Sequence, residues 1–269
     1  MRSRCCSTFL TGALRLVSLG TLSALLLLMM SGAQNPPPAA PSAPTGAGPM
    51  DLPLRLIAEA RQSYQGVQDY TCLFIKRERL REQIQPEHLI AMKVRTQPFS
   101  VYLRWLRPAP TAGQEVCYVA GRNNGMMRVH STGLRGVVGF VSMDPRDPRA
   151  LETSRHTITE AGIGNLIDRF GKAWELESRL NRTQVRVQEY EANSRRCLRV
   201  ETVHTDPAGQ QIPFYRSVVY FDKQNHLPIR VENYDWPRPG FDPAGAIVES
   251  YSYLDLHLNT GLSEAVFVH

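Results

Sequence analysis

Cysteine is scarce in this sequence, and the residue patterns of common catalytic and metal sites are missing. The 269 residues contain five cysteines, none of them spaced as in a CxxC metal or redox motif. The seven histidines are scattered and form no HxH, HxxxH or HExxH pattern. A GxSxG elbow, an SxxK motif and a Walker loop are also missing. We therefore expect a protein that is not an enzyme and that binds neither a metal nor a cofactor.

Long hydrophobic runs are also few, and the longest lies near the N-terminus. Residues 16–30, LVSLGTLSALLLLMM, follow Arg2, Arg4 and Arg15 and precede the small residues Ser31-Gly32-Ala33. Fifteen helical residues span roughly 22 Å, which is short of the ~30 Å core of a bilayer. The pattern is typical of a secretory signal peptide over residues 1–33, cleaved after Ala33. An uncleaved membrane anchor is the alternative. We therefore expect an exported protein in the periplasm or cell envelope of a Gram-negative-type bacterium.

Without the predicted signal peptide, the chain has little excess of charge of either sign. The whole chain has 31 basic and 25 acidic residues, a formal charge of +6. Residues 1–33 hold three arginines and no acidic residue, so 28 basic and 25 acidic residues remain, about +3. We therefore expect no nucleic-acid partner.

The sequence predicts one folded domain behind a linker. Residues 34–50 are rich in proline and alanine and carry no charge, which is typical of a disordered, extended linker. The folded domain is predicted to span residues 51–269. It keeps Cys72, Cys117 and Cys197, an odd number, and we expect them to be buried in strands as small hydrophobic residues.

Two helices and ten strands are predicted within this domain. The first helix begins at Asp51 as a cap, ends at Gly66 and has Leu54, Ile57, Ala58 and Tyr64 near one face. The second carries an apolar stripe formed by Ile163, Leu166, Ile167, Phe170 and Trp174. The predicted strands are 70–80, 88–96, 100–106, 114–120, 126–130, 183–190, 197–204, 214–221, 227–234 and 247–256.

Charged residues within these strands are expected to face solvent. The run from Lys76 to Glu82 alternates in sign, which is typical of an exposed strand end. Glu189 and Glu191 lie two residues apart on one strand, and we interpret them as part of a solvated face.

Several strands alternate apolar and polar residues, so one face of the sheet is apolar and must be covered. The fold class predicted is mainly β (α+β): a curved antiparallel sheet, or incomplete β-barrel, of about 10–11 strands, with amphipathic helices on its concave face. Aromatic residues concentrate in the strands. Most are expected to be core, but a hollow half-barrel lined by them would also accept an acyl chain.

Four segments carry a resemblance to a known family. They are QPFSVYLRWLRP (97–108), GRNNGMMRVHS (121–131), YFDKQNHLPIRVENYDW (220–236) and YSYLDLHLNTGLSEAVF (251–267). In this order, over about residues 52–268, the chain resembles a bacterial family of secreted proteins of unknown function grouped with the LolA/LolB lipoprotein-localisation factors.

The resemblance implies an apolar cavity between the half-barrel and a helical lid, which in the Lol carriers takes lipoprotein acyl chains. We therefore expect a non-catalytic carrier of an apolar ligand such as a lipid or acyl chain. The predicted lining is Met92, Val94, Val101, Leu103, Trp105, Leu198, Val200, Ile229 and Val231. Envelope proteins and the membrane surface are further expected contacts. An envelope scaffold or interaction module with a filled core remains the alternative.

Overall fold

The computed structural model describes residues 48–133, 139–192, 195–209, 211–238, 240 and 243–269. The predicted signal peptide and the linker as far as residue 47 lie outside these residues and stay predictions. The last linker position belongs to the fold, because Met50 is buried in the core. The folded domain thus begins no later than Met50, one residue before the predicted boundary.

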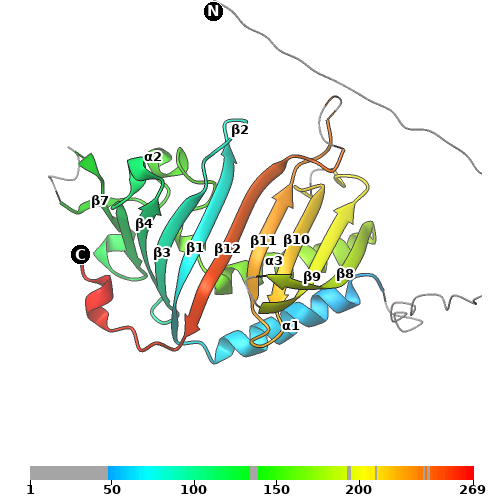
Figure 1. Ribbon diagram of the computed structural model, residues 1–269, viewed down its shortest axis with the longest axis horizontal. Helices are drawn as coiled ribbons and strands as arrows, with labels where there is room; N and C mark the ends of the chain where they lie inside the picture. The colour runs from blue at the N-terminus through cyan, green and yellow to red at the C-terminus, as the bar shows by residue number, and fades with distance from the viewer. Residues whose placement is uncertain (1–47, 134–138, 193–194, 210, 239, 241–242) are drawn as a thin grey trace, which may run out of the picture. The chain divides into compact units, whose positions relative to one another are not determined.

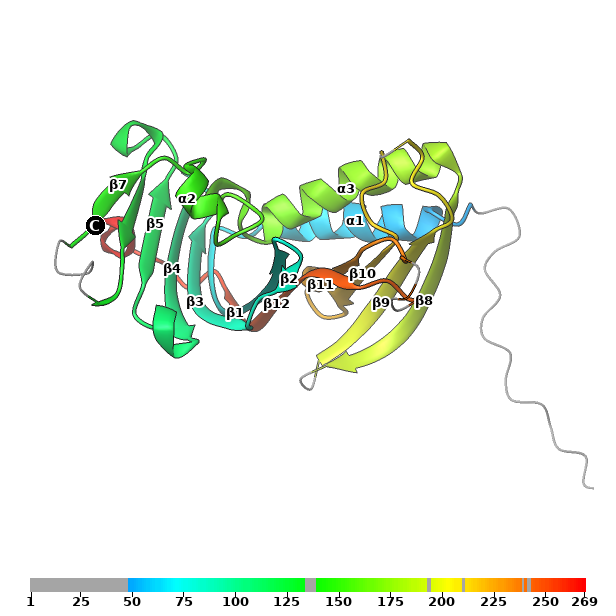
Figure 2. The same cartoon turned by 90° about the horizontal axis from the view of Figure 1, so that it is seen from above.

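Twelve antiparallel strands of the described residues form one sheet (Figure 1). They are β1 Asp69–Leu80, β2 Gln83–Ile84, β3 His88–Arg95, β4 Ser100–Arg107, β5 Glu115–Val119, β6 Met127–His130, β7 Val141–Met143, β8 Thr183–Ala192, β9 Arg195–His204, β10 Arg216–Asp222, β11 Pro228–Tyr234 and β12 Ile247–Leu258. Their order is β7-β6-β5-β4-β3-β1-β12-β11-β10-β9-β8, and β2 pairs with β1. The sheet curves but does not close, since β7 and β8 lie at opposite edges (Figure 2).

The predicted fold class is confirmed, with two strands more than the pattern indicated. All ten predicted strands are present, with ends that differ by at most two residues. The additional strands β2 and β7 have two and three residues, which is too short for an alternating pattern to be recognised.

Two long helices cover one face of this sheet, which we call the inner face (Figure 2). They are α1, Asp51–Gln65, and α3, Ile163–Leu180; the short α2 spans Pro148–Leu151. Single turns of 3₁₀-helix occur at Ala109–Thr111, Asn123–Gly125, Ile158–Glu160 and Glu264–Phe267. No helix among the described residues is both long and apolar enough to cross a membrane.

The predicted stripe of α3 is confirmed, because all five of its residues are buried. The prediction for α1 was wrong in part. Ala58 is exposed, whereas Leu56 and Ala60 are buried beside Ile57. The helix is capped by the backbone at Met50, and Asp51 instead accepts a hydrogen bond from the amide of Gly48.

The start of α3 is fixed against β1 by a close approach. The amide of Ile163 donates to the hydroxyl of buried Tyr70 at 2.8 Å. Gly162 precedes it with a φ of +96°, and a Cβ there would lie 2.7 Å from the same hydroxyl. Only glycine can adopt this backbone conformation with a positive φ and also avoid a clash with the Tyr70 hydroxyl.

The three cysteines of the domain are buried, as predicted, and all three are free. Cys72 and Cys197 lie in the main core, and Cys117 lies in a smaller core on the other face of the sheet. There the C-terminal segment packs Phe267 against Cys117 and Val119.

Candidate functional site

The nine predicted lining residues all belong to the main core or pack against it. Seven have 0–9% of their surface exposed: Met92, Val94, Val101, Leu103, Val200, Ile229 and Val231. Trp105 and Leu198 are half-buried and pack against this core. The placement on one apolar face agrees with the prediction, whereas ligand binding by these residues stays a prediction.

The fold brings these residues together as two groups rather than one. In the first, Met92 pairs with Leu103 and Val94 pairs with Val101 across β3 and β4. The second lies on β9 and β11, and the strands β1 and β12 separate the two groups.

The inner face is filled by side chains at these positions. Two hollows among the described residues have volumes of about 430 Å³ and 330 Å³. The first lies at the turn around Ile84 and the second beside Asp222, and neither is lined by any of the nine residues.

The inner face is less completely buried at one end, on β4 and β5. Phe99, Trp105 and Tyr118 are half-buried there, although they pack against the core. The indole N–H of Trp105 donates to Nδ1 of His88 at 2.9 Å, so the ring is held at a polar rim. Helices α1 and α3 lie over the side of the sheet that contains β8–β12, away from this end (Figure 2).

A row of polar residues crosses the inner face beside its apolar rows. Tyr251 on β12 pairs in register with Val231 and with Lys76. Two residues before Tyr251 on the same strand, Glu249 lies opposite both Glu78 and Asn233. Directly opposite residues of antiparallel strands share a face, so this row faces the helices.

Two carboxylates are buried in this row. Glu78 and Glu249 are 2% and 1% exposed. The hydroxyl of Tyr251 donates to Glu78 at 2.5 Å and lies 3.3 Å from Glu249. The side-chain amide of Asn233 donates to the other oxygen of Glu249 at 2.8 Å.

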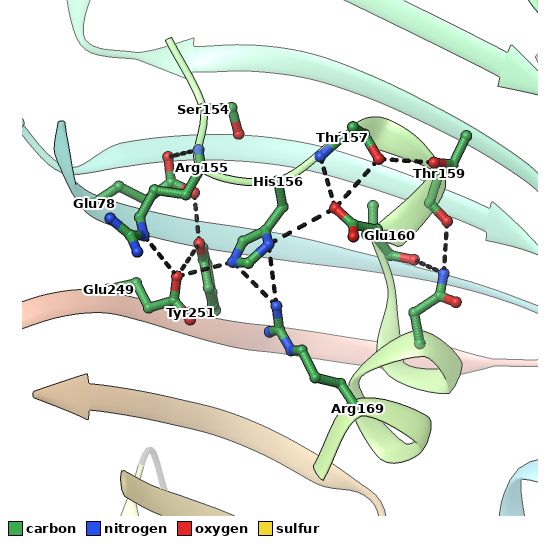
Figure 3. Close-up of polar contacts among 12 residues, drawn as sticks. Glu78, Ser154, Arg155, His156, Thr157, Thr159, Glu160, Arg169, Glu249 and Tyr251 are labelled. Atoms are coloured by element: carbon green, nitrogen blue, oxygen red, sulfur yellow. Dashed lines mark hydrogen bonds and ion pairs between the residues drawn. The ribbon is translucent and has the colours of Figure 1, made fainter. Parts of the chain in front are cut away.

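Basic residues from three elements surround these carboxylates, and Figure 3 shows Arg155, His156 and Arg169 among them. Lys76 of β1 lies 3.1 Å from Glu78. The segment that precedes α3 supplies Arg155 Nε at 3.1 Å and His156 Nε2 at 2.8 Å to the same oxygen of Glu249. Arg169 of α3 reaches the imidazole of His156 at 3.0 Å.

The charges and hydrogen bonds of the cluster shift two of its pKa values. Burial alone would raise the pKa of Glu249, but the hydrogen bond from His156 and the charges of His156 and Arg169 lower it to about 2. The pKa of Tyr251 is far above its usual value, because the hydroxyl is buried and the carboxylates of Glu249 and Glu78 oppose its ionisation. Glu249 is therefore an anion, and Tyr251 is a neutral donor.

The sequence prediction for this region was wrong at Lys76 and Glu78, which are 9% and 2% exposed. Arg81 and Glu82, in the same run, are exposed as predicted. The alternation along β1 could have indicated this burial, because Lys76 and Glu78 lie on the same side of the strand as the buried residues Cys72 and Phe74. Glu189 and Glu191 are exposed, as predicted.

A second buried ion pair lies further along the inner face. His204, 1% exposed, places Nε2 3.0 Å from Oε2 of Glu177 on α3. Its Nδ1 lies 2.8 Å from the carbonyl oxygen of Phe214, so both ring nitrogens face acceptors. Burial alone would lower the pKa of His204, but Glu177 and the carbonyl oxygens raise it above its usual value.

This pair predicts a pH-dependent stability. The imidazolium stabilises the fold fully below the unfolded-state pKa, about 6.5, and this contribution is lost as pH rises through the folded-state pKa. Chemical denaturation between about pH 6 and pH 8 is expected to give a steeper loss of stability for the wild type than for Glu177→Gln. Equal slopes for the two proteins would contradict the pairing.

A broad curved sheet, apolar on its inner face and covered by two long helices, defines the class of half-barrel proteins with a helical cover. Within this class, the chain belongs to the family described as "Protein of unknown function (DUF1571)", whose model matches residues 67–269. No curated protein is similar to it in sequence. The predicted resemblance to a family of unknown function is confirmed.

Several solved structures are similar to the chain. An uncharacterized conserved protein from Thermus thermophilus matches with 9% identity over 80% of this chain and 92% of that chain, at a TM-score of 0.45. Lipoprotein LppX from Mycobacterium tuberculosis has 11% identity, coverages of 78% and 96% and a TM-score of 0.44. A LolA superfamily protein from Nitrosomonas europaea has 12% identity, coverages of 80% and 96% and a TM-score of 0.32.

Proposed function

We propose that this protein is an exported, non-catalytic carrier of the cell envelope that binds a lipid or acyl chain on the inner face of its sheet. The nine residues from Met92 to Val231 that were predicted from the sequence are the proposed lining. The ligand would enter at the β4–β5 end, beside Trp105.

The observation that carries this proposal is the incompletely buried aromatic end of an otherwise apolar face. Phe99, Trp105 and Tyr118 lie on the same face as the core and extend it beyond α1 and α3. Large aromatic side chains that stay half-buried at the end of an apolar surface are typical of a binding site rather than of a sealed core.

Because the inner face is filled, a bound chain has to displace part of the cover. Burial of one CH₂ group contributes about 0.8 kcal/mol, so an acyl chain of about sixteen carbons gains roughly 12 kcal/mol before the costs of binding. This gain is comparable to the whole stability of a domain, about 5–15 kcal/mol. An acyl chain can therefore compete with the contacts between the sheet and its cover.

Native mass spectrometry after gentle purification tests the proposal. We expect adducts of lipid mass on the folded protein, which disappear after extraction with organic solvent. A single ligand-free mass under several extraction conditions would contradict the carrier function.

Export is part of the proposal and rests on the signal sequence of residues 1–33. N-terminal sequencing of the exported protein is expected to begin at Gln34. A chain that retains residues before 30 would contradict cleavage at this site.

An interaction module with a closed core is the second candidate function. Seven of the nine proposed lining residues are at most 9% exposed, which favours this alternative. In that case the β4–β5 end would contact another envelope protein, and the purified chain would carry no lipid.

A further inference from the structure

We propose that the polar row at Glu78 and Glu249 is a subsite for a positively charged head group, which the protein's own Arg155 and His156 occupy in the closed structure. The inference rests on the proposed function and names the ligand class: an amphiphile with an apolar chain and a primary ammonium group.

The floor of this subsite consists of hydrogen-bond acceptors. Glu78 and Glu249 are almost fully buried and lie directly opposite each other on β1 and β12. Asn233, 2% exposed, uses its amide N–H on Glu249, while its Oδ1 has no hydrogen-bond partner among the described residues. A buried acceptor without a donor is rare in proteins, and an ammonium group would supply the donor.

The charge balance of Glu249 depends on a separate segment of the chain. Glu78 is neutralised within the sheet by Lys76. Glu249 is instead contacted by Arg155 and His156, both from the segment before α3. If this segment moves away, Glu249 loses its ion pair with Arg155, while Asn233 and Tyr251 stay as neutral donors and Arg169 of α3 acts on it through its charge alone. A buried carboxylate without a direct ion-pair partner is strongly unfavourable, so a ligand cation is the group that fits there.

Aromatic rings stand beside the carboxylates. Phe74 stacks on Tyr251 with ring centroids 5.7 Å apart, and Tyr253 lies 5.1 Å from Phe74 on the other side. The faces of aromatic rings attract cations, and most strongly where water is excluded. Because Tyr251 is the register partner of Val231, the subsite directly continues the proposed apolar lining.

The segment that occupies the subsite is reachable from solvent. The side chains of Arg155 and His156 are 34% and 28% exposed, whereas the carboxylate beneath them is 1% exposed. The segment is held to the sheet by polar contacts: Lys76 donates to the carbonyl of Thr153 and to Ser154, and the amide of Arg155 donates to Glu78. Such polar contacts can be exchanged for those of a ligand.

Three fluorescent probes with the same acyl chain test this inference on the whole protein. Their head groups are primary ammonium, hydroxyl and carboxylate. We expect the ammonium probe to bind about tenfold more tightly than the hydroxyl probe, the effect of roughly one interaction with a buried charge. Glu249→Gln should abolish this preference.

Arg155→Gln should change probe binding in the direction opposite to Glu249→Gln. It removes the internal competitor, so it should strengthen binding of the ammonium probe and leave binding of the hydroxyl probe unchanged. Arg81→Gln is the matched control, because Arg81 is exposed and pairs only with Glu152 among the described residues. It should change neither affinity. Arg155→Gln keeps the test decisive if Glu249→Gln fails to fold.

The outcomes separate this inference from the proposed function. Equal binding of the ammonium and hydroxyl probes, or preference for the carboxylate probe, would overturn the cationic subsite and leave the carrier function standing. Failure of all three probes to bind would overturn both.

Discussion

Trp174→Ala is expected to lower the free energy of unfolding by about 3–5 kcal/mol, because it removes a large buried side chain and leaves a cavity. Trp174 is 1% exposed on α3 and packs against Phe170 and Phe221, with ring centroids 5.6 Å and 6.1 Å away. Urea denaturation followed by far-ultraviolet circular dichroism measures the loss.

Trp105→Ala is the informative comparison, since it removes the same side chain from the half-buried end of the inner face. It is expected to reduce stability by less than half as much as Trp174→Ala. Equal losses in the two variants would mean that Trp105 is sealed core, and would contradict its proposed place at the ligand entrance.

Glu249→Ala is expected to cost about 3–5 kcal/mol, because it leaves partly buried positive charges without their partner. Arg155 and His156 both lose the carboxylate, and Asn233 loses its acceptor. Thermal and urea denaturation near neutral pH, where Glu249 is ionised, measure this effect.

Glu189→Ala is the matched control. Glu189 pairs with Lys223 at 2.6 Å and with Arg196 at 3.2 Å, but its side chain is 64% exposed. Solvent screens such pairs, so the control should be close to the wild type in stability. A loss at Glu249 as small as at Glu189 would contradict the description of the buried cluster.

Local periodicity was sufficient to predict most of the fold. The stripe from Ile163 to Trp174 specifies a helix with one buried face, and the structure buries each of its members. The alternation of β4 similarly places Val101 and Leu103 inward. These patterns depend only on neighbours in sequence, which is why they can be read without a structure.

The buried polar row could not be predicted in full because its partners are distant in sequence. Two of the residues that contact Glu78 are far from it in the sequence: Arg155 lies 77 residues away, and Tyr251 lies 173 residues away. Parity could have marked Glu78 and Lys76 as inward, but it could not identify these distant partners. The alternating charges around it favour an exposed interpretation instead.

The proposed apolar lining could also be predicted only in part from the sequence. Alternation assigned Val200 and Val231 to the inner face, where the structure places them. The pattern of single strands carries no information on strand order, so it could not show that β1 and β12 lie between these residues and the group on β3 and β4.

Titration of the wild-type protein with a fluorescent fatty acyl probe, in parallel with Trp105→Ala and Trp236→Ala, tests the carrier function most directly. Trp236 is also half-buried, but it packs on Tyr215 away from the proposed lining. We predict saturable binding by the wild type and by Trp236→Ala, and much weaker binding by Trp105→Ala. Absence of saturable binding to the folded wild-type protein would contradict the account.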